Sequence, residues 1–134
     1  MKKALWIGAL ALAGAVALPA AGAHAKKASA PVAALDGDND GTVDLNEVTK
    51  SAEEVFVILE TDSDGTLDQK EVGKRIPKND FAAADSDNSG TLSKDEYLVY
   101  VTGLFKDADP DSDGTLDAKE LKSKKGKALQ RATR

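Results

Sequence analysis

A twelve-residue acidic pattern occurs four times in this chain, and the repeat constrains the fold more than any other feature. Its copies read DGDNDGTVDLNE (36–47), ETDSDGTLDQKE (60–71), DSDNSGTLSKDE (85–96) and DPDSDGTLDAKE (109–120), and they begin 24, 25 and 24 residues apart. Each copy alternates oxygen-bearing side chains, places Gly at its sixth position and ends on Glu. Because hard cations prefer oxygen ligands, the repeat predicts four metal-binding loops.

The first copy shows why the chemistry requires this spacing. Asp36, Asp38 and Asp40 at positions 1, 3 and 5 direct alternate side chains toward one ion. Gly41 lets the backbone turn at position 6, and Glu47 closes the shell with two oxygens at position 12. This is the calcium-loop pattern of the EF-hand. The predicted ligands of the four loops, at positions 1, 3, 5, 7, 9 and 12, are Asp36, Asp38, Asp40, Thr42, Asp44, Glu47, Glu60, Asp62, Asp64, Thr66, Asp68, Glu71, Asp85, Asp87, Ser89, Thr91, Ser93, Glu96, Asp109, Asp111, Asp113, Thr115, Asp117 and Glu120.

Two of the loops depart from the pattern. Loop two begins with Glu60 instead of Asp, which keeps the carboxylate on a side chain one methylene longer. Loop three has Ser89 and Ser93 at positions 5 and 9, which leaves three carboxylates at its ligand positions against five in each other loop. We therefore expect loop three to be the most calcium-like of the four, or the weakest.

Position 8 is apolar in every loop. The four residues are Val43, Leu67, Leu92 and Leu116. In EF-hands this residue is buried where two loops meet, so four of them predict two pairs of loops. The segments between the loops, 48–59, 72–84 and 97–108, are too short for separate exit and entry helices, because about twelve residues give only some 18 Å of helix. Adjacent loops must therefore share one helical segment.

Apolar residues recur at a helical period in the first and third of these segments. They are Leu45, Val48, Ala52, Val55, Phe56 and Leu59 in the first, and Tyr97, Tyr100, Val101, Leu104, Phe105 and Ala108 in the third. Gly73 and Pro77 predict two short helices meeting near Ile76 in the middle segment, and Ser123 predicts the cap of a terminal helix running to about Arg131. The predicted fold is all-α, a small bundle of about three helical units with four closely spaced EF-hand loops at its edge.

The N-terminal residues have the layout of a secretory signal peptide. Lys2 and Lys3 precede an apolar run over 4–18, and small residues end in Ala23-His24-Ala25. A membrane anchor is the alternative, but the run is shorter than the roughly 20 residues that a spanning helix needs. We expect cleavage after Ala25, with Ala23 and Ala30 as alternatives, and export to the periplasm without a stable membrane anchor. The predicted organisation is a signal peptide at 1–25, a linker at 26–35 and a four-EF-hand domain at 36–134.

Composition excludes several classes of chemistry. The chain has no Cys, and cleavage after residue 25 removes its single His and leaves 16 basic residues against 23 acidic ones. Neither a thiol nor an imidazole nucleophile is then present, and 18 of the 23 acids occupy predicted ligand positions. Catalysis by a carboxylate pair is the alternative, but we expect no enzyme. An exported acidic protein is also a poor partner for nucleic acid.

Four EF-hand loops at this spacing resemble the lanmodulin family of periplasmic lanthanide-binding proteins. The resemblance rests on DGTVDLNE (40–47), DSDGTLDQKEV (62–72), GTLSKDEYL (90–98) and DPDSDGTLDAKEL (109–121), and on Asp at position 9. It implies a chain that is largely unstructured without metal and compacts on binding lanthanide. It also implies contact of loop one with loop four and of loop two with loop three. The family's Pro at position 2 is present only as Pro110, and loop three lacks Asp at position 9.

The charges favour lanthanide(III) ions over Ca²⁺, with up to four sites. Five carboxylates at one site leave more residual charge around a divalent ion than around a trivalent one. The alternative is an exported EF-hand calcium protein, a sensor or a buffer, without lanthanide preference. Sensor grooves are rich in Met, whereas the only Met here is Met1. A periplasmic transporter or metalloenzyme that receives the ion fits an exported metal binder, and no residue identifies it.

The C-terminal stretch KELKSKKGKALQRATR (119–134) is strongly basic. Two interpretations fit it. It either docks to anionic lipid or an acidic partner, or forms a solvated helical tail that balances the acidic loops.

Overall fold

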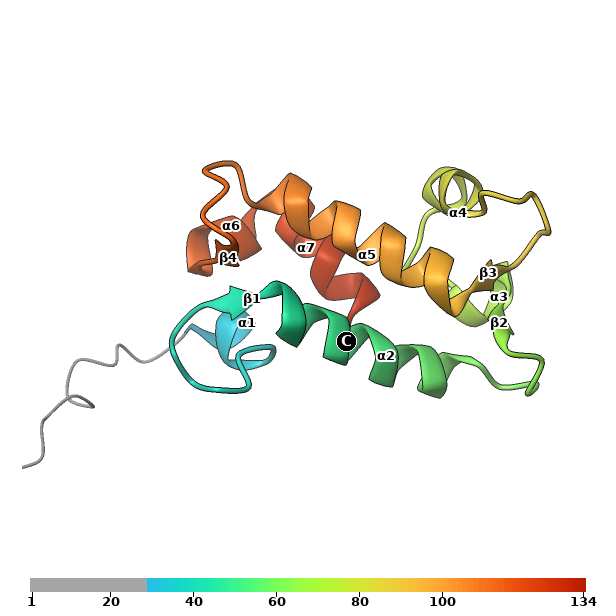
Figure 1. Ribbon diagram of the computed structural model, residues 1–134, viewed down its shortest axis with the longest axis horizontal. Helices are drawn as coiled ribbons and strands as arrows, with labels where there is room; N and C mark the ends of the chain where they lie inside the picture. The colour runs from blue at the N-terminus through green and yellow to red at the C-terminus, as the bar shows by residue number, and fades with distance from the viewer. Residues whose placement is uncertain (1–28) are drawn as a thin grey trace, which may run out of the picture.

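The computed structural model describes residues 29–134 (Figure 1). The signal peptide predicted at 1–25 lies outside the described residues. The helices are α1 Ala30–Ala33, α2 Leu45–Leu59, α3 Gln69–Val72, α4 Lys78–Ala84, α5 Lys94–Ala108, α6 Ala118–Lys122 and α7 Lys124–Ala132. The strands are β1 Val43–Asp44, β2 Thr66–Leu67, β3 Leu92–Ser93 and β4 Thr115–Leu116. The protein is a small helical bundle, as the sequence predicted.

The two long helices α2 and α5 lie side by side and run in opposite directions (Figure 1). Each has 15 residues and spans the distance from one loop to the next. In α2 the Asp44 side chain accepts a hydrogen bond from Glu47 N, and the Glu47 carboxylate accepts one from Asp44 N. The same capping box is present at the start of α3, α5 and α6. In every loop, position 9 is therefore the N-cap of the helix that follows, and position 12 is the third residue of that helix. The expected shared helical segments are confirmed.

The loops pair through their two-residue strands. Strand β1 pairs with β4 so that Val43 faces Leu116, and β2 pairs with β3 so that Leu67 faces Leu92. All four of these side chains are fully buried. The pairing of loop one with loop four and of loop two with loop three is confirmed. One pair lies at each end of the elongated molecule (Figure 1).

The middle segment is broken where the sequence predicted. Helix α3 ends at Gly73, whose φ of 53° lies in the left-handed region, and Pro77 is the N-cap residue of α4. Between them Ile76 is fully buried. The two short helices therefore turn the chain back without leaving the core.

Both ends of the described chain contribute to the core. Residues 30–35 of the predicted linker include α1 and place Val32 and Leu35 against the core cluster. At the other end, Ser123 caps α7 by accepting a hydrogen bond from Gly126 N at 3.0 Å, as the sequence predicted. The Tyr97 hydroxyl donates to the Ala132 carbonyl and ties α7 to α5.

Within residues 29–134 the core cluster runs from Val32 to Ala132. A chain that begins at Lys26 therefore contains all of these core residues and all four loops. Over the described residues, every helix is too short or too polar to cross a membrane.

Candidate metal centre

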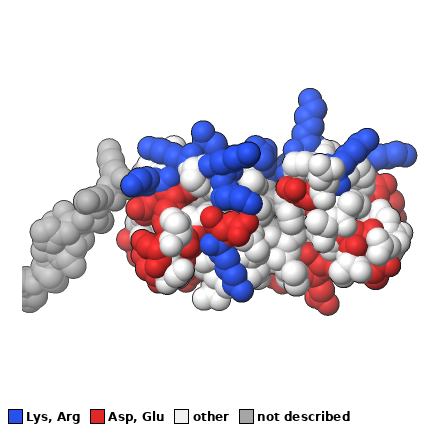
Figure 2. Space-filling view, turned by 90° about the horizontal axis from the view of Figure 1, so that it is seen from above, with Lys and Arg blue, Asp and Glu red and all other residues white. Residues whose placement is uncertain are grey.

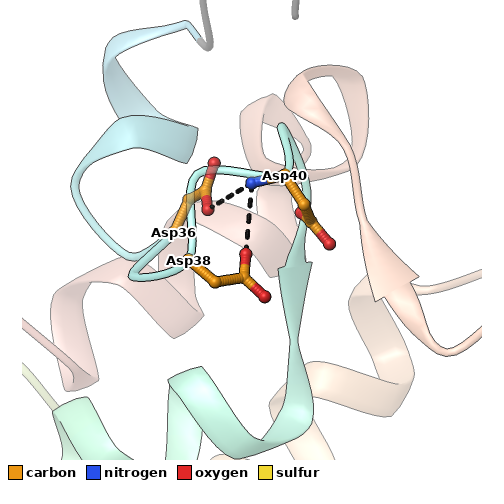
Figure 3. Close-up of side chains that lie close together, drawn as sticks. All are labelled: Asp36, Asp38 and Asp40. Atoms are coloured by element: carbon orange, nitrogen blue, oxygen red, sulfur yellow. Dashed lines mark hydrogen bonds between the residues drawn. The ribbon is translucent and has the colours of Figure 1, made fainter. Parts of the chain in front are cut away.

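Loop one gathers three carboxylates around one point (Figure 3). Asp36, Asp38 and Asp40 each offer an oxygen, and these oxygens all lie within 4.8 Å of one another. The backbone N–H of Asp40 donates to Asp36 Oδ1 and to Asp38 Oδ1, both at 3.1 Å. Positive φ angles at Asn39 (63°) and Gly41 (92°) turn the chain so that these side chains converge.

The other three loops also form clusters within the same 4.8 Å limit, from positions 1, 3 and 5 in loop two and from positions 1, 3 and 12 in loops three and four. They are Glu60, Asp62 and Asp64 in loop two, Asp85, Asp87 and Glu96 in loop three, and Asp109, Asp111 and Glu120 in loop four. Oxygens around a calcium-sized ion at 2.3–2.6 Å lie up to roughly 5 Å apart, so the clusters have the dimensions and the chemistry that a hard cation requires.

The remaining predicted ligands lie in each loop but make other contacts. In loop one Thr42 donates from both N and Oγ1 to Asp40 Oδ1 at 2.8 Å. Thr66 and Thr115 repeat these contacts in loops two and four. The position 9 residues Asp44, Asp68, Ser93 and Asp117 are the N-caps of the helices that follow. The structure thus places these residues beside the clusters, and their role as ligands stays a prediction.

The Glu at position 12 is held by backbone N–H groups. Its Oε1 accepts from the N–H of position 2 in three loops, at 2.6 Å from Gly37, 2.8 Å from Thr61 and 2.9 Å from Ser86. In loop four position 2 is Pro110, which has no N–H to donate. Among the described residues the carboxylate of Glu120 accepts only from Asp117 N, at 3.0 Å, a bond that the Glu of every other loop also receives from position 9.

The hydroxyl groups at position 2 are functional candidates that the sequence analysis did not single out. Thr61 Oγ1 donates to Glu71 Oε1 at 2.9 Å, and Ser86 Oγ donates to Glu96 Oε1 at 2.9 Å. They orient the carboxylate that is predicted to complete the shell of each of these two loops. A hydroxyl residue directly after position 1 is the sequence signal that could have indicated this role.

Loop two accommodates its longer first residue at the cost of one contact. In loop one Asp36 accepts from Asp40 N at 3.1 Å and from Gly41 N at 2.9 Å. Within residues 29–134 the Glu60 carboxylate accepts only from Gly65 N, at 3.1 Å. Asp36 is buried, whereas Glu60 is half-buried. The carboxylate at position 1 of loop two is therefore held by fewer hydrogen bonds than the one at position 1 of loop one.

The pKa values of the loop carboxylates are shifted in different directions. At Asp38 the Asp40 N–H lowers the pKa, but desolvation and the charges of neighbouring acids outweigh it and raise the pKa. The Ser93 N–H, helped by the Ser86 side chain, lowers the pKa of Glu96 to about 2. Burial raises the pKa of Glu120. The closing carboxylate of loop three is therefore held ionised more strongly than that of loop four.

Comparison with known families agrees with this geometry. The family model described as EF hand matches residues 79–99 and 101–123, which contain loops three and four. Loops one and two lie outside the matched residues, but each has the same twelve-residue spacing and also gathers three carboxylates. A search of curated proteins found no match. The family match and the four acidic clusters together support an EF-hand protein that binds metal ions at several sites.

Proposed function

We propose that the chain is an exported protein that binds trivalent lanthanide ions more tightly than calcium and gains helical structure on binding. The observation that supports this proposal is the density of carboxylates in the loops. Loops one, two and four each have five acids at ligand positions, whereas loop three has three. The single family match to the EF hand is equally compatible with calcium, so the charge of the loops is what favours the trivalent ion.

The magnitude of the charge effect is large enough to matter. Two unit charges about 4 Å apart interact by about 1 kcal/mol in water and by about 4 kcal/mol at an effective dielectric constant of 20. A trivalent ion adds one such attraction to each of five carboxylates relative to calcium. The same extra charge meets only three carboxylates in loop three. We therefore expect the preference for lanthanide to be greatest in the five-acid loops.

Folding on metal binding follows from where the acids sit. In each loop the cluster belongs to the same twelve residues as position 9, which is the N-cap of the helix that follows. Without an ion, repulsion between the carboxylates opposes the turn that begins the helix. Neutralising the cluster removes this repulsion and stabilises both the loop and the helix.

The deciding experiment titrates the metal-free chain that begins at Lys26. Helix content is followed by circular dichroism while lanthanum or calcium is added in buffered free concentrations. We expect lanthanum to induce helix at a free concentration at least tenfold lower than calcium. Equal midpoints would contradict the lanthanide preference and leave a calcium protein. A flat response to both ions, with no binding by calorimetry, would contradict metal binding itself.

Loop three supplies a matched control, because Ser93 already caps α5 in the place that Asp117 occupies before α6. Asp117→Ser therefore removes one ligand charge while keeping a residue that can cap the helix. We expect the ratio of lanthanum to calcium affinity at loop four to fall. An unchanged ratio would show that ligand charge does not set the preference.

Export is tested separately from metal binding. Fractionation of cells that produce the full chain should find the protein outside the cytoplasm, with Lys26 as its first residue by N-terminal sequencing. A cytoplasmic protein that retains residues 1–25 would contradict export without affecting the metal proposal.

A further inference from the structure

One side of α7 carries a row of cationic side chains. Lys124, Lys127 and Arg131 are spaced at i, i+3 and i+7, which places them along one face of the helix, and Arg134 follows two residues after the helix ends. All four are exposed. The opposite face packs Gly126, Leu129 and Ala132 into the core. Arg75 Nη1 donates to the Arg131 carbonyl at 3.3 Å and adds a fifth cation. We call these five side chains the basic stripe.

The basic stripe has no acidic counterpart of its own. Residues 121–134 contain no Asp or Glu. The ion pairs found within residues 29–134 are Lys94 with Glu53 and Lys125 with Asp107, and neither includes a residue of the stripe. Figure 2 shows Lys and Arg gathered along one long edge of the molecule, while Asp and Glu lie mostly along the other edge and at the ends.

Metal loading changes the balance between these two charged regions. Residues 29–134 have 14 basic and 23 acidic residues, a formal charge of −9. Of these acids, 18 occupy ligand positions, so the rest of the described chain has a formal charge of +9. Four trivalent ions would bring the total to +3, and four calcium ions would bring it to −1. The metal-free protein is thus repelled by an anionic surface that the loaded protein can approach.

We propose that the basic stripe is a docking surface for an anionic phospholipid bilayer, and that metal loading of the loops switches this docking on. The inference rests on the proposed metal binding. The docking is peripheral and adds no membrane-spanning segment.

A bilayer fits the stripe better than a folded acidic protein does. Protein interfaces are usually anchored by a few aromatic or Arg side chains buried in a well-packed centre from which water is excluded. The large apolar residues exposed in the described chain are Val57, Ile58 and Val99, which belong to α2 and α5 and not to α7. The outward side of a helix is also convex, and long flexible side chains on it can each reach a mobile lipid headgroup. Contacts of this kind need charge and no shaped pocket.

The test measures sedimentation of the chain from Lys26 with vesicles. One vesicle set contains phosphatidylcholine with phosphatidylglycerol, and the other contains phosphatidylcholine alone. Lanthanum-loaded protein is desalted first, so that free metal does not bridge protein and lipid. We expect the loaded protein to bind the anionic vesicles at least tenfold more tightly than the metal-free protein does. We expect no binding of the loaded protein to the neutral vesicles. Raising the salt concentration should weaken this binding.

Two double variants separate the stripe from net charge. K124Q/K127Q removes two cations from the stripe, whereas K50Q/K106Q removes two exposed cations from α2 and α5 that lie outside the metal loops. Each basic residue next to an anionic surface strengthens vesicle binding by about fivefold. We therefore expect the stripe variant to bind the anionic vesicles about 30-fold more weakly than the wild type, and the affinity of the control variant to change by less than about threefold. Equal losses in both variants, or no binding by the loaded wild type, would overturn the proposal. Circular dichroism of the same samples shows whether metal binding itself has failed.

Discussion

Replacing Gly126 with Ala tests whether the close approach of α6 and α7 is as tight as the structure shows. A Cβ atom at this position would lie 2.5 Å from Leu121 Cα and 2.6 Å from its carbonyl carbon, and closer still to the Glu120 carbonyl oxygen. All of these neighbours are backbone atoms of α6 or its C-terminal turn. Unlike the end of a flexible side chain, they cannot move aside without displacing the helix.

The expected loss follows from this rigidity. Overpacking usually costs about 1–3 kcal/mol, and backbone contacts this short place Gly126→Ala at the upper end or beyond. For a domain of this size, 1 kcal/mol lowers the Tm by about 4–8 °C. A loss of about 3 kcal/mol therefore predicts a fall of at least about 12 °C. Since Glu120, the last predicted ligand of loop four, lies within α6, we also expect weaker metal binding in loop four.

Gly103→Ala provides the matched control. Gly103 lies inside α5, and a Cβ atom there would meet nothing within 4 Å. The same substitution should stabilise this helix by about 0.5–1 kcal/mol, because Ala loses less conformational freedom than Gly. Thermal unfolding at saturating metal, followed by circular dichroism, compares the two variants. If Gly126→Ala melts at or above the wild-type temperature, the packing described between α6 and α7 is wrong.

Three further predictions concern the loops and the core. Glu60→Asp should tighten metal binding in loop two, because the shorter side chain can accept a second backbone N–H as Asp36 does; calorimetry that finds weaker binding would show that the longer chain is already accommodated. Tyr97→Phe should cost about 1–3 kcal/mol in urea unfolding, because it leaves the buried Ala132 carbonyl without its donor, and an unchanged midpoint would refute that bond. On acidification loop four should release its ion at a higher pH than loop three, since the pKa of Glu120 is raised while that of Glu96 is lowered to about 2. Amide NMR signals of the position 6 glycines report the two loops separately, and release in the reverse order would contradict this assignment.

Much of the fold could be predicted because the loop repeat fixes both spacing and pairing. The apolar residue at position 8 predicted that the loops meet in pairs, and Val43 indeed faces Leu116. The break in the middle segment followed from Gly73 and Pro77, whose backbone preferences are local. These features depend on a few neighbouring residues, so one sequence was sufficient.

Other features depend on contacts between distant segments. The sequence did not reveal that Gly126 lies against α6, because a Gly within a helix usually indicates only that the helix is less stable there. It also did not reveal that α1 enters the core, since a four-residue helix has no measurable period. In the loops, the bond from Ser86 to Glu96 spans ten residues and depends on how the loop closes. Periodicity and motif patterns contain no information about such contacts.

The antiparallel helices α2 and α5 belong to two similar halves of the chain. Each half of the protein is a loop, a 15-residue helix and a second loop, and each loop pairs only with a loop of the other half. The molecule therefore has the connectivity of a two-fold dimer whose subunits have been fused through the turn at Gly73–Pro77. Neither half can complete a loop pair alone. Fragments cut at this turn should stay unfolded when separate and reassemble when mixed in the presence of metal.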